Sequence, residues 1–271
     1  MDHIRSEGVE LDFEIKGSGE PVLLIHGTCI ADAFQPLMDV PELADRFQLV
    51  RYHRRSYASS SQTPQLMSIA DHAADARLVL EELYIDKAHL VGHDLGGVIA
   101  LQLALDNPEL VHTLTLAEPL LLMVPSWVAA VGGVSPALDL YLSGDKAAAV
   151  NSFLELSSGP DFLQALEARI PGAIAGAIRD ASAFFENDML ALGSWEFETS
   201  SPPTQPVLSI LCERPADFFA DGRRLIHEWL PQTEDLDLFN AGHLLQIDNP
   251  AGMGAGLSWF FSRHPMAPPG V

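Results

Sequence analysis

The chain of 271 residues is poor in cysteine and in basic side chains. Its two cysteines, Cys29 and Cys212, are too few for a disulfide framework, so a reducing compartment such as the cytoplasm is expected. Only 15 Lys and Arg oppose 37 Asp and Glu, which gives a formal net charge of −22. Such an acidic surface repels phosphate backbones and anionic lipids, which argues against nucleic acid and membranes as partners.

Long apolar runs are missing as well. The longest, LLLMVPSWVAAVGGV (120–134), is interrupted by Pro125 and Gly132 and is too short for a membrane span. The N-terminal MDHIRSEGVELDF is charged and lacks the apolar region of a signal peptide. Because the sequence shows neither a metal-ligand cluster nor a dinucleotide motif, we expect no metal and no cofactor.

What the sequence does contain is an alternation of apolar runs with helical stretches. Continuous apolar runs are typical of parallel strands whose two faces are covered by helices, and four of them occur early in the chain, at 21–27, 47–53, 88–94 and 111–119. Residues 68–85 and 97–106 have helical spacing. This alternation predicts an α/β fold with a mostly parallel central sheet flanked by helices.

The pattern changes between about residues 120 and 200. Helix-like pieces bounded by Gly, Pro or Ser follow one another there, and strand patterns resume at 206–212 and 233–239. We therefore predict a core formed by residues 1–119 and 201–271, interrupted by a helical cap inserted at residues 120–200.

The stretch GHDLGG (92–97) connects a predicted strand directly to a predicted helix. So sharp a turn strains the backbone at its tip and leaves room only for small neighbours, which Gly92 and Gly96 supply. Asp94 at the tip would stand above the C-terminal edge of the sheet, where open α/β sheets bind ligands. The positive end of the following helix would stabilise its charge, so Asp94 is a candidate nucleophile.

Together with LLIHG (23–27) and NAGHLLQIDNP (240–250), this turn resembles the α/β-hydrolase family over nearly the whole chain. Serine is the usual residue at the tip, and aspartate marks the branch that contains haloalkane dehalogenases and soluble epoxide hydrolases. The resemblance implies the α/β-hydrolase fold and His243 as the catalytic base. It also implies that the oxyanion hole is formed by the N–H groups of Thr28 and Leu95.

The acid that partners His243 is less obvious. At the commonest family position, the turn after PVLSIL (206–211), Pro215 stands where the acid would be. The other family position is the end of the strand LTLAEP (114–119), which holds Glu118. Glu118 is therefore the first choice, followed by Asp217 and then Glu213.

The expected substrate is a small apolar molecule, because the predicted cap is rich in apolar side chains. Epoxide hydrolases usually protonate the ring oxygen through cap tyrosines, and Tyr141 is the one tyrosine in the predicted cap. The other expected substrate contacts are Trp127, Met123 and Trp195. In the loop 51–61, Tyr57 could reach the cleft and His53 could border it. Whether the chain forms a homodimer is left open.

These observations predict a hydrolase in which Asp94 attacks an alkyl carbon, most readily that of an epoxide, and forms a covalent ester. Water activated by His243 would then release the product while Glu118 supports the imidazole. A haloalkane dehalogenase is an alternative, although that branch usually has a Trp where this chain has Leu95. Two further alternatives are an esterase or lactonase relative in which Asp94 replaces the nucleophilic serine, and a non-catalytic binding protein with the same fold.

Overall fold

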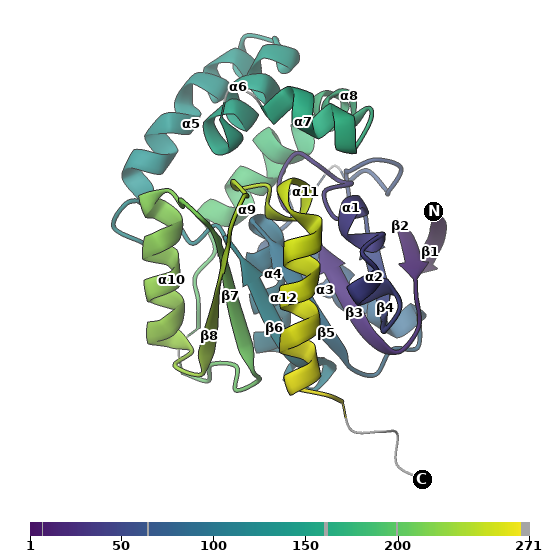
Figure 1. Cartoon of the computed structure of the whole chain (residues 1–271). Helices are drawn as coiled ribbons and strands as arrows, with labels where there is room; N and C mark the ends of the chain where they lie inside the picture. The colour runs from purple at the N-terminus through teal and green to yellow at the C-terminus, as the bar shows by residue number, and fades with distance from the viewer. Residues whose placement is uncertain (7, 64, 160–161, 199, 267–271) are drawn as a thin grey trace.

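A computed structural model describes residues 1–6, 8–63, 65–159, 162–198 and 200–266. Eight strands form one sheet in the order β1-β2-β4-β3-β5-β6-β7-β8 (Figure 1). Their bounds are β1 Asp2–Ser6, β2 Val9–Lys16, β3 Glu20–Ile25, β4 Phe47–Tyr52, β5 Ala88–His93, β6 Val111–Ala117, β7 Val207–Cys212 and β8 Thr233–Leu238. The strands β3 to β8 pair in parallel, whereas β1 and β2 pair antiparallel at one edge. The predicted α/β fold with a mostly parallel sheet is confirmed.

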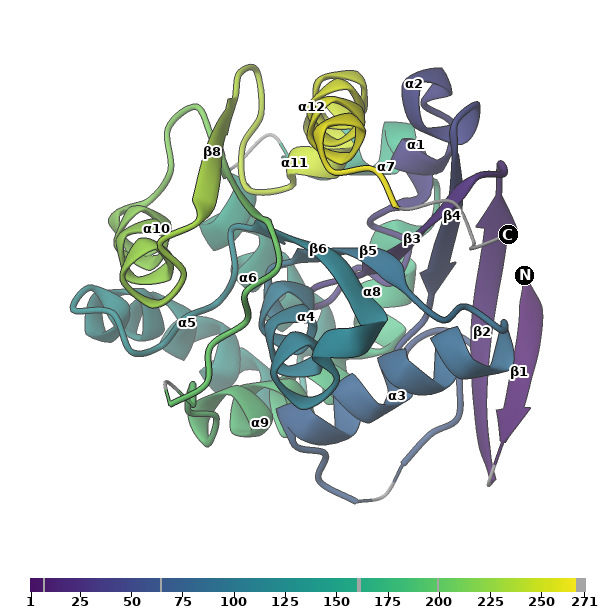
Figure 2. The same ribbon diagram turned by 90° about the horizontal axis from the view of Figure 1, so that it is seen from below.

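Helices cover both faces of this sheet (Figure 2). One face carries α3 (Ile69–Glu82), α4 (Leu95–Asp106) and α10 (Asp217–Trp229). The other carries α1 (Gln35–Met38), α2 (Pro41–Ala44), α11 (Leu245–Asp248) and α12 (Pro250–Arg263). A short 3₁₀ turn, η1 (Pro108–Leu110), leads into β6.

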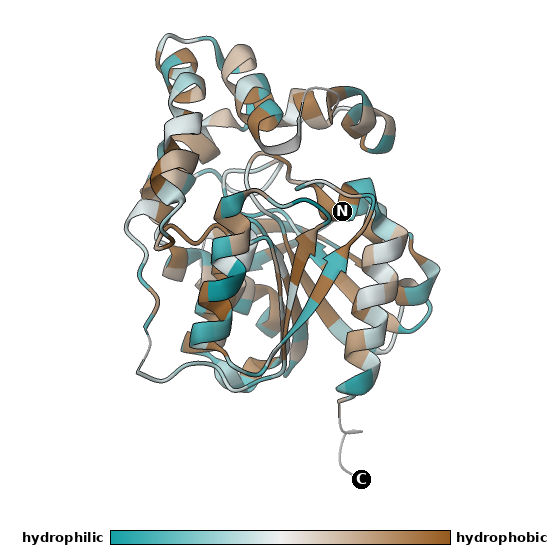
Figure 3. Ribbon diagram, turned by 60° about the vertical axis from the view of Figure 1, so that its left-hand side comes forward, coloured by the Kyte–Doolittle hydropathy of each residue, from teal (hydrophilic) through white to brown (hydrophobic). Residues whose placement is uncertain are grey.

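Successive residues of a central strand face opposite sides of the sheet and pack into two different hydrophobic cores. In β3, Leu23 and Ile25 pack on the side of α3 and α4, whereas Val22 and Leu24 pack on the side of α12. This follows from the two-residue period of a strand, and it explains why the central parallel strands are mostly apolar on both faces, whereas the edge strand β8 (TEDLDL) is only partly buried. Figure 3 shows hydrophobic residues along these central strands.

Between β6 and β7 the chain forms α5 (Trp127–Leu142), α6 (Lys146–Ser158), α7 (Phe162–Arg169), α8 (Ala173–Arg179), the π-helix η2 (Ala183–Asp188) and α9 (Met189–Gly193). We call these the inserted helices, and they fall within the predicted cap, 120–200. Figure 1 shows α5 to α8 above the C-terminal edge of the sheet. They share a core with the loop after β3, through Cys29 and Ile30, and with Leu244 and Ile247 after β8.

The hairpin β1–β2 and helix α12 are the longest elements that were not predicted from the sequence; the short α1, α2, η1 and α11 were not predicted either. The hairpin β1–β2 has the alternating apolar pattern of a sheet edge, not the continuous runs that identify the central strands. Helix α12 contains three glycines within PAGMGAGLSWFFSR, which weaken its helical signal. At Gly254 a Cβ atom would lie 2.5 Å from Cγ1 of Val40, so close packing against the chain before α2 requires glycine there.

Candidate active site

The turn between β5 and α4 places Asp94 at the C-terminal edge of the sheet. Its backbone has φ 57° and ψ −123°, which is unusual for a residue with a side chain. The turn can be this tight because its neighbours are glycines. A Cβ atom at Gly92 would lie 2.2 Å from the carbonyl oxygen of Gly96, and one at Gly96 would lie 2.0 Å from that of Ile25. Asp94 is 2% exposed, so its carboxylate depends on protein partners.

One oxygen of that carboxylate lies in a pocket of backbone donors. Asp94 Oδ1 accepts hydrogen bonds from Thr28 N at 2.8 Å and from Leu95 N at 2.7 Å. These are the two N–H groups expected to form the oxyanion hole. Gly27, the residue before Thr28, must be glycine because a Cβ atom there would lie 2.5 Å from Asp94 Cβ.

The other carboxylate oxygen faces His243, which lies in the loop after β8. His243 Nε2 is 3.2 Å from Asp94 Oδ2, and Nδ1 is 2.7 Å from Glu118 Oε2. Glu118 follows β6 with a φ of 44° and is fully buried, and its Oε1 accepts a hydrogen bond of 2.8 Å from Cys212 N. The structure therefore brings Asp94, His243 and Glu118 together in one hydrogen-bonded line.

The two other acid candidates lie elsewhere. Asp217 is the first residue of α10, and Glu213 is exposed and accepts a hydrogen bond from Asn240 N. The family resemblance made Glu118 the first choice, and the structure places its carboxylate 2.7 Å from His243 Nδ1.

The charges in this line stabilise one another. Burial alone would lower the pKa of His243, but its hydrogen bonds to Asp94 and Glu118 raise it to about 10. Burial alone would raise the pKa of Asp94, but the hydrogen bond and charge of His243 lower it to about 2. The pKa of Glu118 is lowered for the same reason, against the effect of its burial. At neutral pH the site is thus an imidazolium between two carboxylates.

Two rings hold the imidazole of His243 in place. Phe219 from α10 stacks on it with ring centroids 4.6 Å apart and planes inclined by 13°. His93 lies 4.7 Å away, and its Nε2 is 2.8 Å from the carbonyl oxygen of His243. Burial lowers the pKa of His93 to about 4, so it is neutral, donates through Nε2 and accepts from Gln246 through Nδ1. His93 is thus bonded to the His243 carbonyl and to Gln246, and it supports the loop that carries His243.

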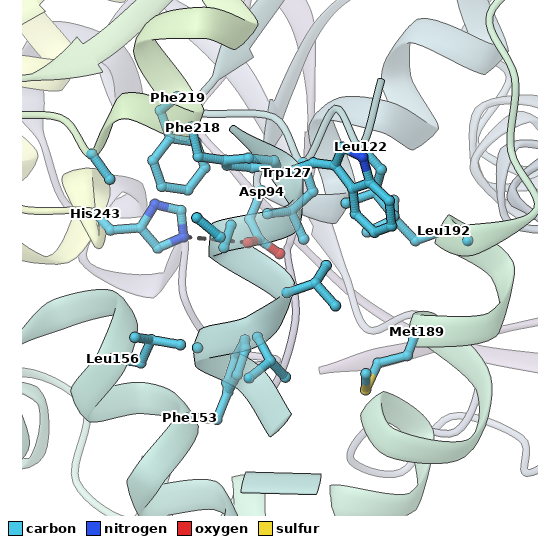
Figure 4. Close-up of a pocket in the computed structure, with 18 of the residues that line it drawn as sticks. Asp94, Leu122, Trp127, Phe153, Leu156, Met189, Leu192, Phe218, Phe219 and His243 are labelled. Carbon is cyan, nitrogen blue, oxygen red and sulfur yellow. Dashed lines mark hydrogen bonds and ion pairs between the residues drawn. The ribbon is translucent and has the colours of Figure 1, made fainter. Parts of the chain in front are cut away.

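A cavity of about 380 Å³ opens over Asp94 and His243 (Figure 4). Its walls come from the segment after β6, from the inserted helices and from α10, and they are almost entirely apolar: Leu122, Trp127, Phe153, Leu156, Phe184, Met189, Leu192, Phe218 and Phe219. Among the described lining residues, Asp94 and His243 are the ionisable ones and none carries a hydroxyl. The site can therefore hold an apolar molecule against one charged pair.

Of the four predicted substrate contacts, the structure places Trp127 on the cavity wall and the other three away from it. Tyr141 stacks on Phe185 and donates its hydroxyl hydrogen bond to Glu186. Trp195 donates to Gln102 Oε1 at 2.7 Å, and Met123 is 39% exposed. These three side chains are thus engaged in packing, in a hydrogen bond or with solvent. Apolar residues were expected in the cap, but their sequence pattern does not show which of them face the cavity.

In the loop 51–61, the two residues expected near the cleft, Tyr57 and His53, are not among the residues that line the cavity. Tyr57 is fully buried, and its hydroxyl donates to Asp188 Oδ2 at 2.6 Å. Its neighbour Arg54, also fully buried, pairs with the same carboxylate. His53 is bound to Asp32 at 3.0 Å. The sequence pointed to the loop 51–61 as one that could border the pocket. It could not show that Arg54 of this loop pairs with Asp188, which lies 134 residues further along the chain.

The described residues show no group of three His, Cys, Asp or Glu side chains arranged to hold a metal ion. Within the same part of the chain, no helix has both the length and the apolar composition needed to cross a bilayer.

The mostly parallel sheet is combined with a strained turn between β5 and α4, at which the line of Asp94, His243 and Glu118 lies. Residues 20–167 match the family described as alpha/beta hydrolase fold. The chain belongs to the α/β hydrolase fold family.

Curated relatives match part of the chain. The putative carbamate hydrolase RutD of Azorhizobium caulinodans is 33% identical over 119 residues, which are 44% of this chain and 44% of that protein. The uncharacterized hydrolase YraK of Bacillus subtilis is 32% identical over 120 residues, 43% of this chain and 44% of that protein. The matched part thus spans less than half the length of these relatives.

Solved structures match nearly the whole chain. The enol-lactonase from Burkholderia xenovorans LB400 has a TM-score of 0.81 at 16% identity, covering 96% of this chain and all of that one. Est816, described as an N-acyl homoserine lactone degrading enzyme, has a TM-score of 0.72 at 20% identity over the same shares. At these identities the likeness concerns the fold.

Proposed function

We propose that the protein is a hydrolase that opens apolar epoxides through a covalent ester on Asp94. One observation carries this proposal: Asp94 Oδ1 accepts hydrogen bonds from both N–H groups of the expected oxyanion hole, while Oδ2 lies beside His243 at the cavity. When water attacks Cγ of the ester, the charge develops on Oδ1, where those donors already point. The hydrogen bonds that Asp94 makes before the reaction are thus the ones that would stabilise the oxyanion during hydrolysis of the ester.

The proton balance closes with His243 alone. Asp94 Oδ2 attacks a ring carbon, the carbon–oxygen bond breaks, and the imidazolium of His243 gives its proton to the departing oxygen, directly or through one water. The imidazole is then neutral and takes a proton from the water that attacks Cγ. When the oxyanion collapses, the remaining proton of the added water passes to the leaving alkoxide, which releases the diol and leaves the Asp94 carboxylate and the imidazolium. The first half-reaction thus starts from the charge states that the hydrogen bonds favour, and the second restores them.

The same geometry argues against the alternatives. Serine-type hydrolysis of esters or lactones needs the oxyanion hole for the substrate carbonyl, so with Asp94 bound there this chain would lack that activity. Rapid release of halide from an unactivated haloalkane needs N–H donors, and both backbone donors are already bound to Asp94; a benzylic bromide is activated enough to react without them. Among the described wall residues, the indole of Trp127 is the remaining side-chain N–H apart from His243.

The test is to weigh the intact protein after reaction. An epoxide adds its whole mass to wild-type protein quenched in acid, whereas a benzylic bromide adds its mass less hydrogen bromide. Because bromide leaves without a proton, His243→Gln should accumulate the benzylic adduct on Asp94 and react with epoxides far more slowly than wild type.

Two variants complete the design. Asp94→Ala should take up neither probe, and His112→Gln, which removes a histidine bonded to the His264 carbonyl, should behave as wild type. Adducts mapping elsewhere than Asp94, or none with either probe, would contradict the proposal and favour a binding protein.

A further inference from the structure

A buried guanidinium lies directly behind the oxyanion hole. Arg54 follows β4 and has no exposed surface. Its Nη1 and Nη2 donate to the two carboxylate oxygens of Asp188 at 2.9 and 2.7 Å, and Nη2 also donates to the carbonyl oxygen of Gly27 at 3.0 Å. The pair is therefore bidentate and shares one donor with the backbone.

That carbonyl belongs to the peptide unit whose N–H is the Thr28 donor. The unit is thus bound at both ends: Gly27 O accepts from Arg54, and Thr28 N donates to Asp94 Oδ1 at 2.8 Å. His26 adds a second donor, since its Nδ1 lies 2.8 Å from Gly27 O while its Nε2 accepts from Arg54 N. A cation at the carbonyl end fixes the peptide plane and polarises the N–H toward the carboxylate.

The partner of Arg54 belongs to the inserted helices. Asp188 ends the π-helix η2, a rare geometry that often marks functional sites. Phe184 in the same π-helix and Met189, the next residue, line the cavity. The wall that contacts the substrate and the carboxylate that holds Arg54 are therefore parts of one short segment.

Stability alone is a weak reason for this pair. Removing two charges from water is costly, and apolar residues of similar volume often fold equally well in place of a buried ion pair. The tyrosine hydroxyl of Tyr57 joins the same carboxylate at 2.6 Å and lies 3.4 Å from Cys29 N, one residue beyond the hole. The whole polar cluster converges on the segment 27–29.

We propose that Arg54 is a positioning residue for the oxyanion hole, which aims the Thr28 N–H at Asp94, and that Asp188 couples this alignment to the cavity wall. The consequence for turnover rests on the proposed function: Arg54 accelerates hydrolysis of the Asp94 ester, where the oxyanion forms, and has little effect on formation of the ester.

The alignment itself is tested without substrate. Lysine at position 54 keeps the positive charge but has no fork to bind Asp188 and Gly27 O together. In amide NMR spectra, Arg54→Lys should move the Thr28 proton upfield because its hydrogen bond to Asp94 weakens. The matched control is Arg55→Lys, since Arg55 makes a similar bidentate pair with Asp75 at 2.7 Å on both oxygens. Equal Thr28 shifts in the two variants, or none in Arg54→Lys, would overturn the inference.

The catalytic consequence is tested by loading Asp94 with a benzylic bromide and following the loss of the adduct by mass. Removal of one oxyanion donor typically costs 10²–10³ in rate, so a misaligned donor should slow hydrolysis by roughly 10- to 100-fold while loading stays near the wild-type rate. The double variant Arg54→Met with Asp188→Leu should fold but remain slow. Recovery of wild-type hydrolysis in that variant would show a purely structural pair.

The two proposals fail separately. If His243→Gln takes up no probe, the proposed function falls, but the NMR comparison still decides whether Arg54 aligns the peptide. If Asp94 is loaded and Arg54→Lys hydrolyses its ester as fast as Arg55→Lys, only the role of Arg54 falls.

Discussion

Replacing Glu118 by glutamine should block hydrolysis of the Asp94 ester while leaving the fold intact. The carboxylate of Glu118 accepts two hydrogen bonds, from Cys212 N at 2.8 Å and from His243 Nδ1 at 2.7 Å. An amide of the same size has one accepting oxygen and one donating nitrogen. It can satisfy one of these two donors but not both.

The buried Cys212 N–H decides which bond is lost. An unsatisfied buried donor costs roughly 1–3 kcal/mol, so the amide oxygen should stay with Cys212 and the NH₂ group should turn toward His243. His243 would then carry its proton on Nε2 and could not act as a base toward water. The same tautomer error in a serine protease lowers turnover on the order of 10⁴, and we expect a loss of about 10³–10⁴ in ester hydrolysis.

The assay follows decay of the benzylic adduct on Asp94 by intact mass. Glu118→Gln should retain the adduct far longer than wild type, with a melting temperature close to that of wild type. Glu213→Gln and Asp217→Asn are the matched controls and should hydrolyse the ester at near the wild-type rate. Rapid hydrolysis in Glu118→Gln, or an equally slow Asp217→Asn, would refute the role assigned to Glu118.

Other expected outcomes follow from the same contacts. The rate of ester formation from an epoxide should fall as pH rises past the His243 pKa of about 10, because the departing oxygen needs the imidazolium proton. The rate of ester formation from the benzylic bromide should not fall, since bromide leaves without a proton. Both rates are measured from the mass of acid-quenched protein at a series of pH values. In urea unfolding, the stability advantage of wild type over His243→Gln should be complete below the ordinary histidine pKa of 6.5 and shrink as pH rises toward about 10, because the folded pKa is raised. An advantage that grows with pH would contradict this. Gly27→Ala should slow ester hydrolysis on the order of 10²-fold, since its Cβ would lie 2.5 Å from Asp94 Cβ, whereas Gly132→Ala, with open space around it, should not.

The parts of the fold that the sequence predicts are those with one strong local signal. All six parallel strands lie close to their predicted ranges. For β3 to β7 the reason is that burial on both faces requires mostly apolar runs, whereas β8 at the edge is only partly buried. The strained turn at Asp94 was predictable because its glycines face backbone atoms at distances that no Cβ tolerates. Glu118 and His243 were chosen because they stand at the positions where the α/β-hydrolase family, which the chain resembles, carries its acid and its histidine.

What the sequence did not predict depends on packing between distant segments. Tyr141 and Trp127 lie on the same inserted helix, but only Trp127 lines the cavity. The stacking of Phe219 on His243 depends on how α10 packs beside the loop after β8. Arg54 and Asp188 are 134 positions apart, so the sequence does not show that they pair. Nor does it show that Arg54 binds the Gly27 carbonyl, the contact that connects the pair to the oxyanion hole.

The most direct test of the covalent ester is a single turnover of an apolar epoxide in ¹⁸O-water with protein in excess. If water attacks Cγ of the Asp94 ester, the first diol is unlabelled and the peptide containing Asp94 gains one ¹⁸O. If the diol carries the label and that peptide does not, water attacks the substrate directly and Asp94 is not the nucleophile.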